Sequence, residues 1–239
     1  AVLVAVKTWQ VNEAAAAILP LLGRNSIVVP LQNGVDAPAQ LGAAVGADHV
    51  VGGLCKIIAQ VTRPGVIHHI AADPFIAFGE IEPAGKNDRL ENLRSAFVRA
   101  GVDCEIATDI VAAIWEKFLF ITPWGSLGAF TRLPAGAIRS DPQLRTRLMK
   151  AMQEIVEIAR RRRVNLPADA ADKTMRVIDG LPPDSTSSMQ RDIMAGRPSE
   201  LEGQTGAVVR LGRAAGVPAP IHQAIYAALL PLERKARGA

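Results

Sequence analysis

Lys117 is the residue whose neighbours in the sequence most favour a catalytic role. In the stretch IVAAIWEKFLFITPW, helical spacing places Ile114, Phe118 and Ile121 around its side chain. An ammonium group among apolar side chains loses hydration, which favours release of its proton near neutral pH, as a proton donor requires. The alternative interpretation is a surface lysine whose ammonium reaches solvent past an apolar stem.

Lys7 and Asn33 each come at the end of a strand-like stretch. Lys7 follows AVLVAV, and Asn33 follows SIVVPLQ immediately before a glycine. Ligands of open α/β sheets collect at the carboxyl ends of the strands, so both side chains are candidates for ligand binding. A surface lysine and an ordinary Asn-Gly turn are the alternatives.

Ser188 and Glu200 each lie at a predicted helix start. The spacing predicts two capping boxes, one in SSMQ that begins with Ser187 as the N-cap of its helix and one in SELE with Ser199 as the N-cap. Backbone N–H groups at helix starts favour anions, so the two starts could together hold a ligand that carries a carboxylate. The alternative is two ordinary caps.

These side chains lie in two parts of the sequence that differ in their predicted secondary structure. Up to residue 108, strand-like and helix-like segments alternate, which predicts an α/β domain with a parallel sheet. From residue 109, helical patterns are separated by Pro, Gly and Asp, so we expect one domain at 1–108 and a helical domain at 109–239. The expected strands are 1–7, 26–34, 49–60 and 102–108, with a hairpin at 65–81 and helices at 11–22, 37–46 and 87–101.

Composition indicates a globular protein: of 239 residues, 49% are apolar and 21% are charged. The formal net charge of +4 suits an anionic small molecule. The basic run at 160–163 follows a helical pattern and complements a helix dipole, and only 4% of residues are aromatic, so we expect no nucleic acid. No apolar run is expected to span a membrane, and two cysteines indicate a reducing cytoplasm.

Several common kinds of site are not expected. His68 and His69 are adjacent on a predicted strand and face opposite sides, and no Cys/His cluster has zinc spacing, so we expect no metal site. No Gly-x-Ser-x-Gly elbow supports serine hydrolysis. No glycine-rich phosphate loop follows a strand either, and the chain opens directly on a strand of buried type. We therefore expect a further segment upstream.

Seven fragments occur in an order that resembles the ketopantoate reductase (2-dehydropantoate 2-reductase) family: AVKTWQ, LQNG, GVIHHI…FGE, IWEKF, SSMQRDI, GRPSELE and GVPAPIH. The resemblance covers essentially the whole chain. It implies a partial dinucleotide-binding (Rossmann-like) α/β domain, followed by an all-α domain like the C-terminal domain of 6-phosphogluconate dehydrogenase. The implied activity is NADPH-dependent reduction of a 2-keto acid to a 2-hydroxy acid, which for ketopantoate is a step of pantothenate biosynthesis.

The resemblance also implies roles for the five candidate residues. Lys117 resembles the catalytic lysine that protonates or polarises the keto oxygen. Lys7 and Asn33 are similar to residues that line the nicotinamide-ribose region of the NADPH site, and Asn33 also contacts substrate. Ser188 resembles a serine that contacts the substrate carboxylate, and Glu200 resembles an acidic residue that closes the cofactor and substrate site.

Three positions depart from the family members that act on ketopantoate. Those members carry asparagine where this chain has Ile121, Gly125 and Ala135. The expected substrate is therefore ketopantoate or a related, more apolar 2-keto acid. Because the glycine-rich segment does not occur in the sequence, a non-catalytic homologue that serves as a binding or oligomeric scaffold is the alternative. The uncovered edge of the first strand would permit a homodimer.

Overall fold

The computed structural model describes residues 1–82 and 87–238, without the side chains of residues 71 and 72. The chain divides into two compact units. The first unit comprises Ala1–Gln32 and Ala37–Ile114, and the second comprises Asn33–Asp36 and Trp115–Ala239. The short segment Asn33–Asp36 therefore packs with the second unit, although it follows a strand of the first. The predicted domain boundary after Thr108 stays a prediction.

The first unit is the expected α/β arrangement. Strand β1 (Val2–Val4) pairs in parallel with β2 (Val28–Pro30), and Val28 also bridges in parallel to Val50, next to the following strand. The helices between and after these strands are α1 (Val11–Ile18), α2 (Ala37–Val45) and α3 (Asp88–Arg99), with short 3-10 turns η1 (Thr8–Gln10), η2 (Leu19–Leu21) and η3 (Ala47–His49).

The second sheet of this unit has the order β3-β4-β5. Strand β3 (Gly52–Arg63) pairs antiparallel with β4 (Val66–Gly79), and β4 pairs in parallel with β5 (Asp103–Ile106). The hairpin predicted inside residues 65–81 is wrong, because those residues form the single long strand β4. The chain turns instead before β4, where Gly65 has a φ of 76°, a backbone conformation that glycine adopts at little cost.

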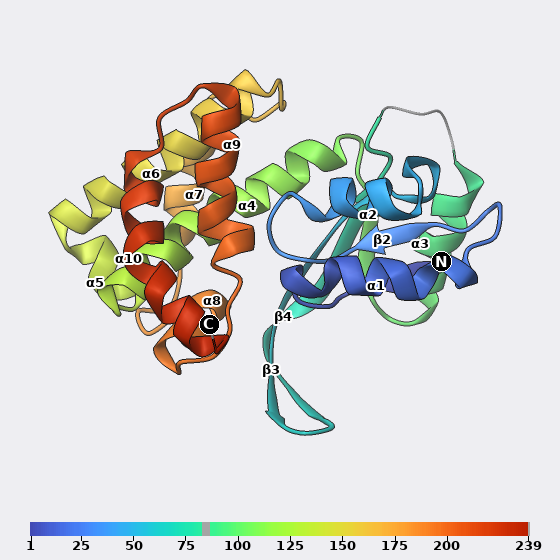
Figure 1. The fold of residues 1–239 in the computed structure, drawn as a ribbon, viewed down its shortest axis with the longest axis horizontal. Coiled ribbons are helices and arrows are strands. Elements are labelled where there is room, and N and C mark those ends of the chain that lie inside the picture. The colour runs from blue at the N-terminus through green and yellow to red at the C-terminus, as the bar shows by residue number, and fades with distance from the viewer. Residues whose placement is uncertain (83–86, 239) are drawn as a thin grey trace. The chain divides into compact units, whose positions relative to one another are not determined.

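The outer half of the β3–β4 hairpin extends away from the rest of the first unit (Figure 1). Its apolar side chains are open to solvent: Val61 is 69% exposed and Ile67 is 73% exposed. Only the inner half of the hairpin contributes to a core, through residues such as Phe78, which is fully buried. The hydrophobic stabilisation of this sheet therefore comes from its inner end.

Among its described residues the second unit contains helices and no strand, as expected. Helix α6 lies at its centre and contacts α5, α7, α9 and α10. The buried face of α6 repeats every three or four residues, as a core helix requires, through Leu148, Met152, Ile155 and Ile158. The helices are α4 (Ile110–Thr131), which begins in the first unit, α5 (Ala135–Ser140), α6 (Pro142–Arg161), α7 (Ala170–Asp179), α8 (Ser188–Met194), the π-helix η4 (Glu202–Gly206), α9 (Ala207–Ala215) and α10 (Pro220–Ala236).

Helix α4 is long and apolar enough, by length and composition alone, to cross a membrane. It has 22 residues and a window with a mean hydropathy of 1.2. The expectation that no segment reaches this length was therefore wrong. However, 67% of that window is buried inside the protein, as in the core helix of a globular fold.

Candidate active site

A buried carboxylate, Glu200, is the centre of the candidate site. Its side chain is only 5% exposed. Its Oε2 accepts a hydrogen bond from Asn33 Nδ2 at 3.1 Å and another from Gln204 Nε2 at 3.4 Å. All three residues belong to the second unit. The fold thus brings two predicted site residues, 167 positions apart in the sequence, into direct contact.

The chain beyond Glu200 enters a π-helix, and this geometry places Gln204 beside the carboxylate. The N–H of Gly206 donates to the carbonyl of Leu201 at 2.9 Å, which is an i+5 bond. The N–H of Gln204 donates to the Glu200 carbonyl at 2.9 Å. Single π-turns within helices occur frequently at functional sites. The irregular turn here gives Glu200 an amide donor from its own helix.

Gly34 lets the Asn33 segment approach this π-helix closely. Its φ of 94° lies in the left-handed region, and an added Cβ would lie 2.6 Å from the Gly203 carbonyl oxygen. Asp36 ties the same segment to α9 through an ion pair with Arg210 at 2.7 Å. The Asn-Gly sequence is therefore a turn, as the alternative interpretation has it, and the same turn carries Asn33 to Glu200.

The capping box predicted from Ser199 is wrong. Its hydroxyl donates to Glu233 Oε2 at 2.5 Å. Glu202, the predicted reciprocal member of the box, accepts a hydrogen bond from the Tyr226 hydroxyl and lies 3.6 Å from Arg210. Partners 34 and 24 positions away in the sequence compete for the two side chains, so the local pairing does not form.

Of the capping box predicted from Ser187, the N-cap bond is confirmed and the reciprocal bond from the Gln190 side chain is wrong. The Ser187 hydroxyl accepts from the N–H of Gln190 at 3.0 Å, and Ser188 is the first residue of α8. The side-chain amide of Gln190 donates elsewhere, to the Leu133 carbonyl at 3.0 Å. Ser188 itself is exposed, so its hydroxyl is open to a molecule in solution.

Lys117 lies on α4 within the second unit and is half-buried. Trp115 and Phe118 beside it in the sequence are 5% and 1% exposed, and their ring centroids are 5.8 Å apart. Ile114, one turn earlier, is also buried, whereas Ile121, one turn later, is half-buried. The apolar neighbours that the sequence predicts for this lysine are therefore present along its own helix.

Lys7 does not belong to the unit that holds the other four candidate residues. It is half-buried in the first unit, between β1 and η1. Its Nζ lies 5.8 Å from the centroid of the Trp9 ring, a distance at which a cation and an aromatic face attract each other.

Two of the three positions at which the chain lacks a family asparagine are packed against the segment that leads into α8. A Cβ added to Gly125 would lie 2.9 Å from Ser187 Oγ. Ala135 is fully buried, and its N–H donates to the Ser185 carbonyl at 3.0 Å. The space that a longer side chain would need is filled by this segment. At the third position, Ile121 presents an apolar side chain.

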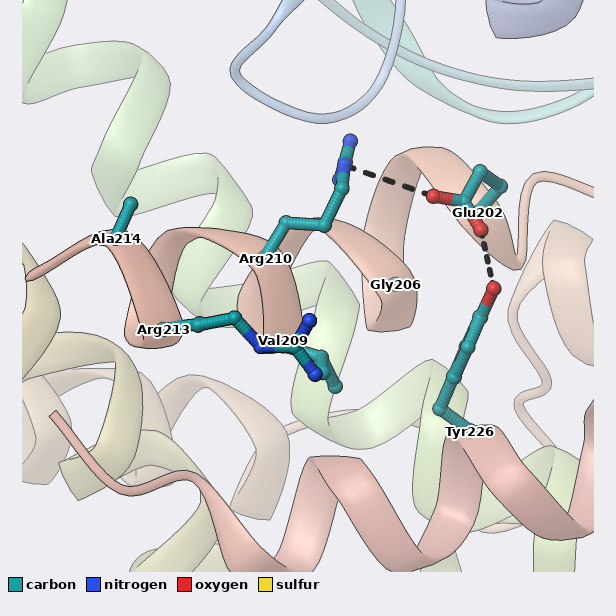
Figure 2. A pocket seen from close by; sticks show the side chains of 7 residues that line it. All are labelled: Glu202, Gly206, Val209, Arg210, Arg213, Ala214 and Tyr226. Atoms are coloured by element: carbon teal, nitrogen blue, oxygen red, sulfur yellow. Dashed lines mark hydrogen bonds and ion pairs between the residues drawn. The ribbon is translucent and has the colours of Figure 1, made fainter. Parts of the chain in front are cut away.

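A surface pocket of about 400 Å³ lies beside the π-helix, on α9 and α10 (Figure 2). Figure 2 shows Glu202 between Arg210 and Tyr226, to both of which it is bonded. Burial, and then the neighbouring Glu202 carboxylate, raise the pKa of Tyr226 to about 12. The pocket contains none of the five candidate residues; its lining is Glu202, Gly206, Val209, Arg210, Arg213, Ala214 and Tyr226.

The donors and acceptors around Glu200 suit a polar ligand rather than a metal ion. Within residues 1–82 and 87–238, no group of three His, Cys, Asp or Glu side chains could hold a metal. A carboxylate and an amide side by side can bind hydroxyl or carboxamide groups of a ligand. Lys117 adds a proton donor to the same unit, and Ser188 adds an exposed hydroxyl.

Sequence reasoning missed two residues of this region, Gln204 and Glu233. Gln204 lies four positions after Glu200, a helical neighbour spacing that could have suggested the contact. Glu233 gives no such signal, because it reaches Ser199 from a helix that lies 34 positions further along the chain.

Comparison with known proteins shows the same two-part organisation. The family model described as "Ketopantoate reductase PanE/ApbA" matches residues 1–83, and "Ketopantoate reductase PanE/ApbA C terminal" matches residues 109–233. A curated relative, the 2-dehydropantoate 2-reductase of Aquifex aeolicus, is 26% identical over 232 residues, which cover 94% of this chain and 73% of the relative.

Solved structures have a similar fold. A ketopantoate reductase of the PanE/ApbA family from Ralstonia eutropha is 27% identical, with a TM-score of 0.87 over 98% of this chain and 76% of that one. A D-mandelate dehydrogenase solved with NADH and anilino(oxo)acetate is 16% identical, with a TM-score of 0.88 over 98% of this chain and 76% of that one, and shows the shared fold alone. The chain belongs to the ketopantoate reductase family of oxidoreductases, with a Rossmann-like α/β part followed by a helical part.

Proposed function

We propose that this protein reduces a 2-keto acid to the corresponding 2-hydroxy acid with NADPH. The observation that carries the proposal is the buried pairing of Glu200 with Asn33 and Gln204. Burying a carboxylate costs free energy unless hydrogen bonds compensate it, so such a group is retained where it has a use. Family membership supports the reaction class, and the pairing of Glu200 with Asn33 and Gln204 supports the location of the active site.

In this proposal Lys117 is the proton donor. NADPH, when bound, supplies the hydride that adds to carbon 2 of the keto acid. The Lys117 ammonium transfers a proton to the keto oxygen as negative charge develops there, which leaves a neutral amine that solvent reprotonates. Stabilising this developing charge is a large contribution that a protein makes to such a reaction. Ser188 donates its hydroxyl hydrogen to the substrate carboxylate.

The residues present fit one half of the cofactor better than the other. Lys7, Asn33 and Glu200 carry an ammonium, an amide and a carboxylate, which suit the hydroxyls and the carboxamide of a nicotinamide riboside. No strand of the printed sequence is followed by a glycine-rich loop for the pyrophosphate. We therefore assign the nicotinamide half to this chain's residues and leave the pyrophosphate without an assignment.

The proposed substrate is ketopantoate or a related 2-keto acid with a more apolar side chain. The Gly125 and Ala135 positions are filled by the segment before α8, and Ile121 is apolar. A polar substituent left without a partner in a closed site costs about 1–3 kcal/mol, which would favour an apolar substrate. With ketopantoate as substrate, the reaction belongs to pantothenate biosynthesis, in the cytoplasm. A homodimer with the edge of β1 at its interface is part of the same proposal.

Oxidation of NADPH in the presence of a panel of 2-keto acids tests the proposed function. The panel contains ketopantoate and 2-keto acids with straight and branched alkyl side chains, each also tested with NADH. We expect turnover with at least one member and a preference for NADPH. If neither the printed chain nor a version extended upstream oxidises NADPH with any member, the proposal is overturned.

The sequence itself favours one alternative, a non-catalytic scaffold, because a pyrophosphate loop is not among its motifs. Titration of NADPH fluorescence discriminates the two. A scaffold would bind no NADPH in either the printed or the extended form, whereas the reductase would bind it at least in the extended form.

A further inference from the structure

We propose that Glu233, on the C-terminal helix α10, is a positioning residue that fixes the backbone at Ser199 and thereby aims Glu200 at Asn33. This inference rests on the proposed function for its kinetic consequence, but its structural part can be tested separately. Glu233 does not contact Glu200 in this proposal; it acts through the neighbouring residue.

The contacts between Glu233 and Ser199 are numerous and buried. Ser199 is fully buried and Glu233 is 5% exposed. The N–H of Ser199 donates to Glu233 Oε1 at 3.0 Å and to Oε2 at 3.1 Å, and the Ser199 hydroxyl donates to Oε2 at 2.5 Å. One carboxylate therefore holds both the backbone and the side chain of a single residue. Hydrogen bonds to a charged acceptor are among the stronger ones in proteins.

Arg237, the C-cap residue of α10, completes the anchor one turn after Glu233. Its Nε donates to Glu233 Oε1 at 2.6 Å, and its Nη2 donates to the Ser199 carbonyl at 2.9 Å. The positive charge compensates the buried carboxylate, which would otherwise be costly. The N–H, the hydroxyl and the carbonyl of Ser199 are thus all bonded to side chains of α10 and its C-cap.

The segment before Ser199 is exposed from Met194 to Pro198. It is bonded to the end of α8, where the N–H of Arg197 donates to the Asp192 carbonyl at 2.9 Å. From Ser199 onward the chain is buried: the Leu201 N–H donates to Ser199 Oγ at 3.2 Å, and Leu201 is fully buried. Ser199 is therefore the first buried residue after this exposed segment, one residue before Glu200. A displacement at Ser199 moves the Cα of Glu200 and lengthens the 3.1 Å contact with Asn33.

A double-mutant cycle in kcat tests whether Glu233 acts through Glu200. The variants are Glu233→Gln, Glu200→Gln and the pair. We expect Glu233→Gln to lower kcat by about 100-fold, the loss typical of a reacting group misplaced by about 1 Å. In the Glu200→Gln background, the same change should lower kcat by less than about 3-fold. The reason is that Glu233 acts through the Glu200 carboxylate, which this background has already lost. Effects that multiply would overturn the proposal.

Hydrogen exchange gives a readout that does not depend on activity. In Glu233→Gln we expect faster exchange of the Ser199, Leu201 and Gln204 amides, with the amides of α6 and α9 unchanged. Unchanged exchange at these amides would contradict the anchor, whatever the kinetics. Absence of reductase activity in the wild type would refute the proposed function alone, because exchange would still decide the role of Glu233.

Two further variants guard against simple unfolding. Ser199→Ala removes the hydroxyl, with its bonds to Glu233 and to the Leu201 N–H, but keeps the bonds of the backbone N–H and carbonyl. We expect a smaller loss of kcat than in Glu233→Gln. Glu157→Gln is the matched control, because Glu157 also pairs with arginines three and four positions later, but on the exposed end of α6. We expect wild-type kcat in the control. An equal loss in Glu157→Gln would assign the effect to general destabilisation and overturn the proposal.

Discussion

The two units of this protein differ in the polar side chains that they bury. Among the described side chains of the first unit, Gln32 is the buried polar one, and it serves the backbone by donating to the Val4 and Val6 carbonyls at 2.9 and 3.1 Å. The second unit buries a series of polar groups, and many of these bond to another side chain: Ser126 to Thr205, His222 to the half-buried Glu154, Glu200 to Gln204, and Ser199 to Glu233.

The two units therefore differ in the kind of interaction that stabilises their interiors. An apolar core such as that of the first unit stabilises a sheet by burial, and this effect does not depend on the direction of hydrogen bonds. Buried polar groups cost free energy unless each finds its partner, and a connected set of them fixes a single arrangement. In the second unit, hydrogen bonds from Asn33 and Gln204 fix the position of the buried Glu200 carboxylate, which an apolar core could not do.

Loss of Lys117 is expected to have the largest effect. Lys117→Ala should lower kcat by about 10²–10⁴-fold, the contribution typical of a positioned proton donor, with a much smaller change in the apparent dissociation constant of the substrate. Steady-state kinetics with the best 2-keto acid measures both. Lys150→Ala, at an exposed position of α6, is the control and should retain wild-type kcat. Equal effects of Lys117→Ala on turnover and binding would mean that the lysine only binds.

A methyl group at Gly125 is expected to have the next largest effect. Its Cβ would lie 2.9 Å from Ser187 Oγ, so Gly125→Ala should lower the free energy of unfolding by about 1–3 kcal/mol and displace the start of α8. Denaturant unfolding measures this. Gly23→Ala in the first unit is the control, because no atom lies within 4 Å of the added Cβ. An unchanged unfolding free energy in Gly125→Ala would show that the close packing at α8 does not constrain the site.

The alkaline limb of the stability profile tests the Glu202–Tyr226 contact. The folded state holds the Tyr226 proton more tightly than the unfolded chain, because burial and Glu202 raise its pKa to about 12. This contribution is fully present below the unfolded pKa of about 10 and is lost as the pH rises through about 12. Tyr226→Phe should therefore lose less stability than the wild type across this range. Parallel profiles for the two proteins would contradict the assignment.

Changes at the outer half of the β3–β4 hairpin are expected to have the smallest effect. Ile67→Thr should alter the unfolding free energy by less than about 0.5 kcal/mol, because the side chain is 73% exposed. Phe78→Ala, at the buried end of the same strand, should cost about 3–5 kcal/mol. Thermal unfolding of both variants gives the contrast. A large loss in Ile67→Thr would show that the hairpin is covered in solution.

Features set by near neighbours in the sequence were the predictable ones. The alternating segments of the first unit, the helices of the second and the Ser187 cap all depend on residues within a few positions of each other. The errors occurred where distant residues compete. The Ser199 hydroxyl donates to Glu233, Glu202 bonds to Tyr226 instead of completing the box, and the hairpin turns before β4 rather than within it. No local pattern contains the Asn33–Glu200 contact, which only the family resemblance suggested.

The contact between Asn33 and Glu200 is tested most directly by a double-mutant cycle in kcat/KM for NADPH-dependent reduction of a 2-keto acid. The variants are Asn33→Ala, Glu200→Gln and the pair, assayed with the wild type. We expect each single change to cost about 1.5–3 kcal/mol in transition-state stabilisation, and the pair to cost clearly less than their sum, because they share one hydrogen bond. Fully additive costs, or single variants as active as the wild type, would contradict a reductase site built around this carboxylate.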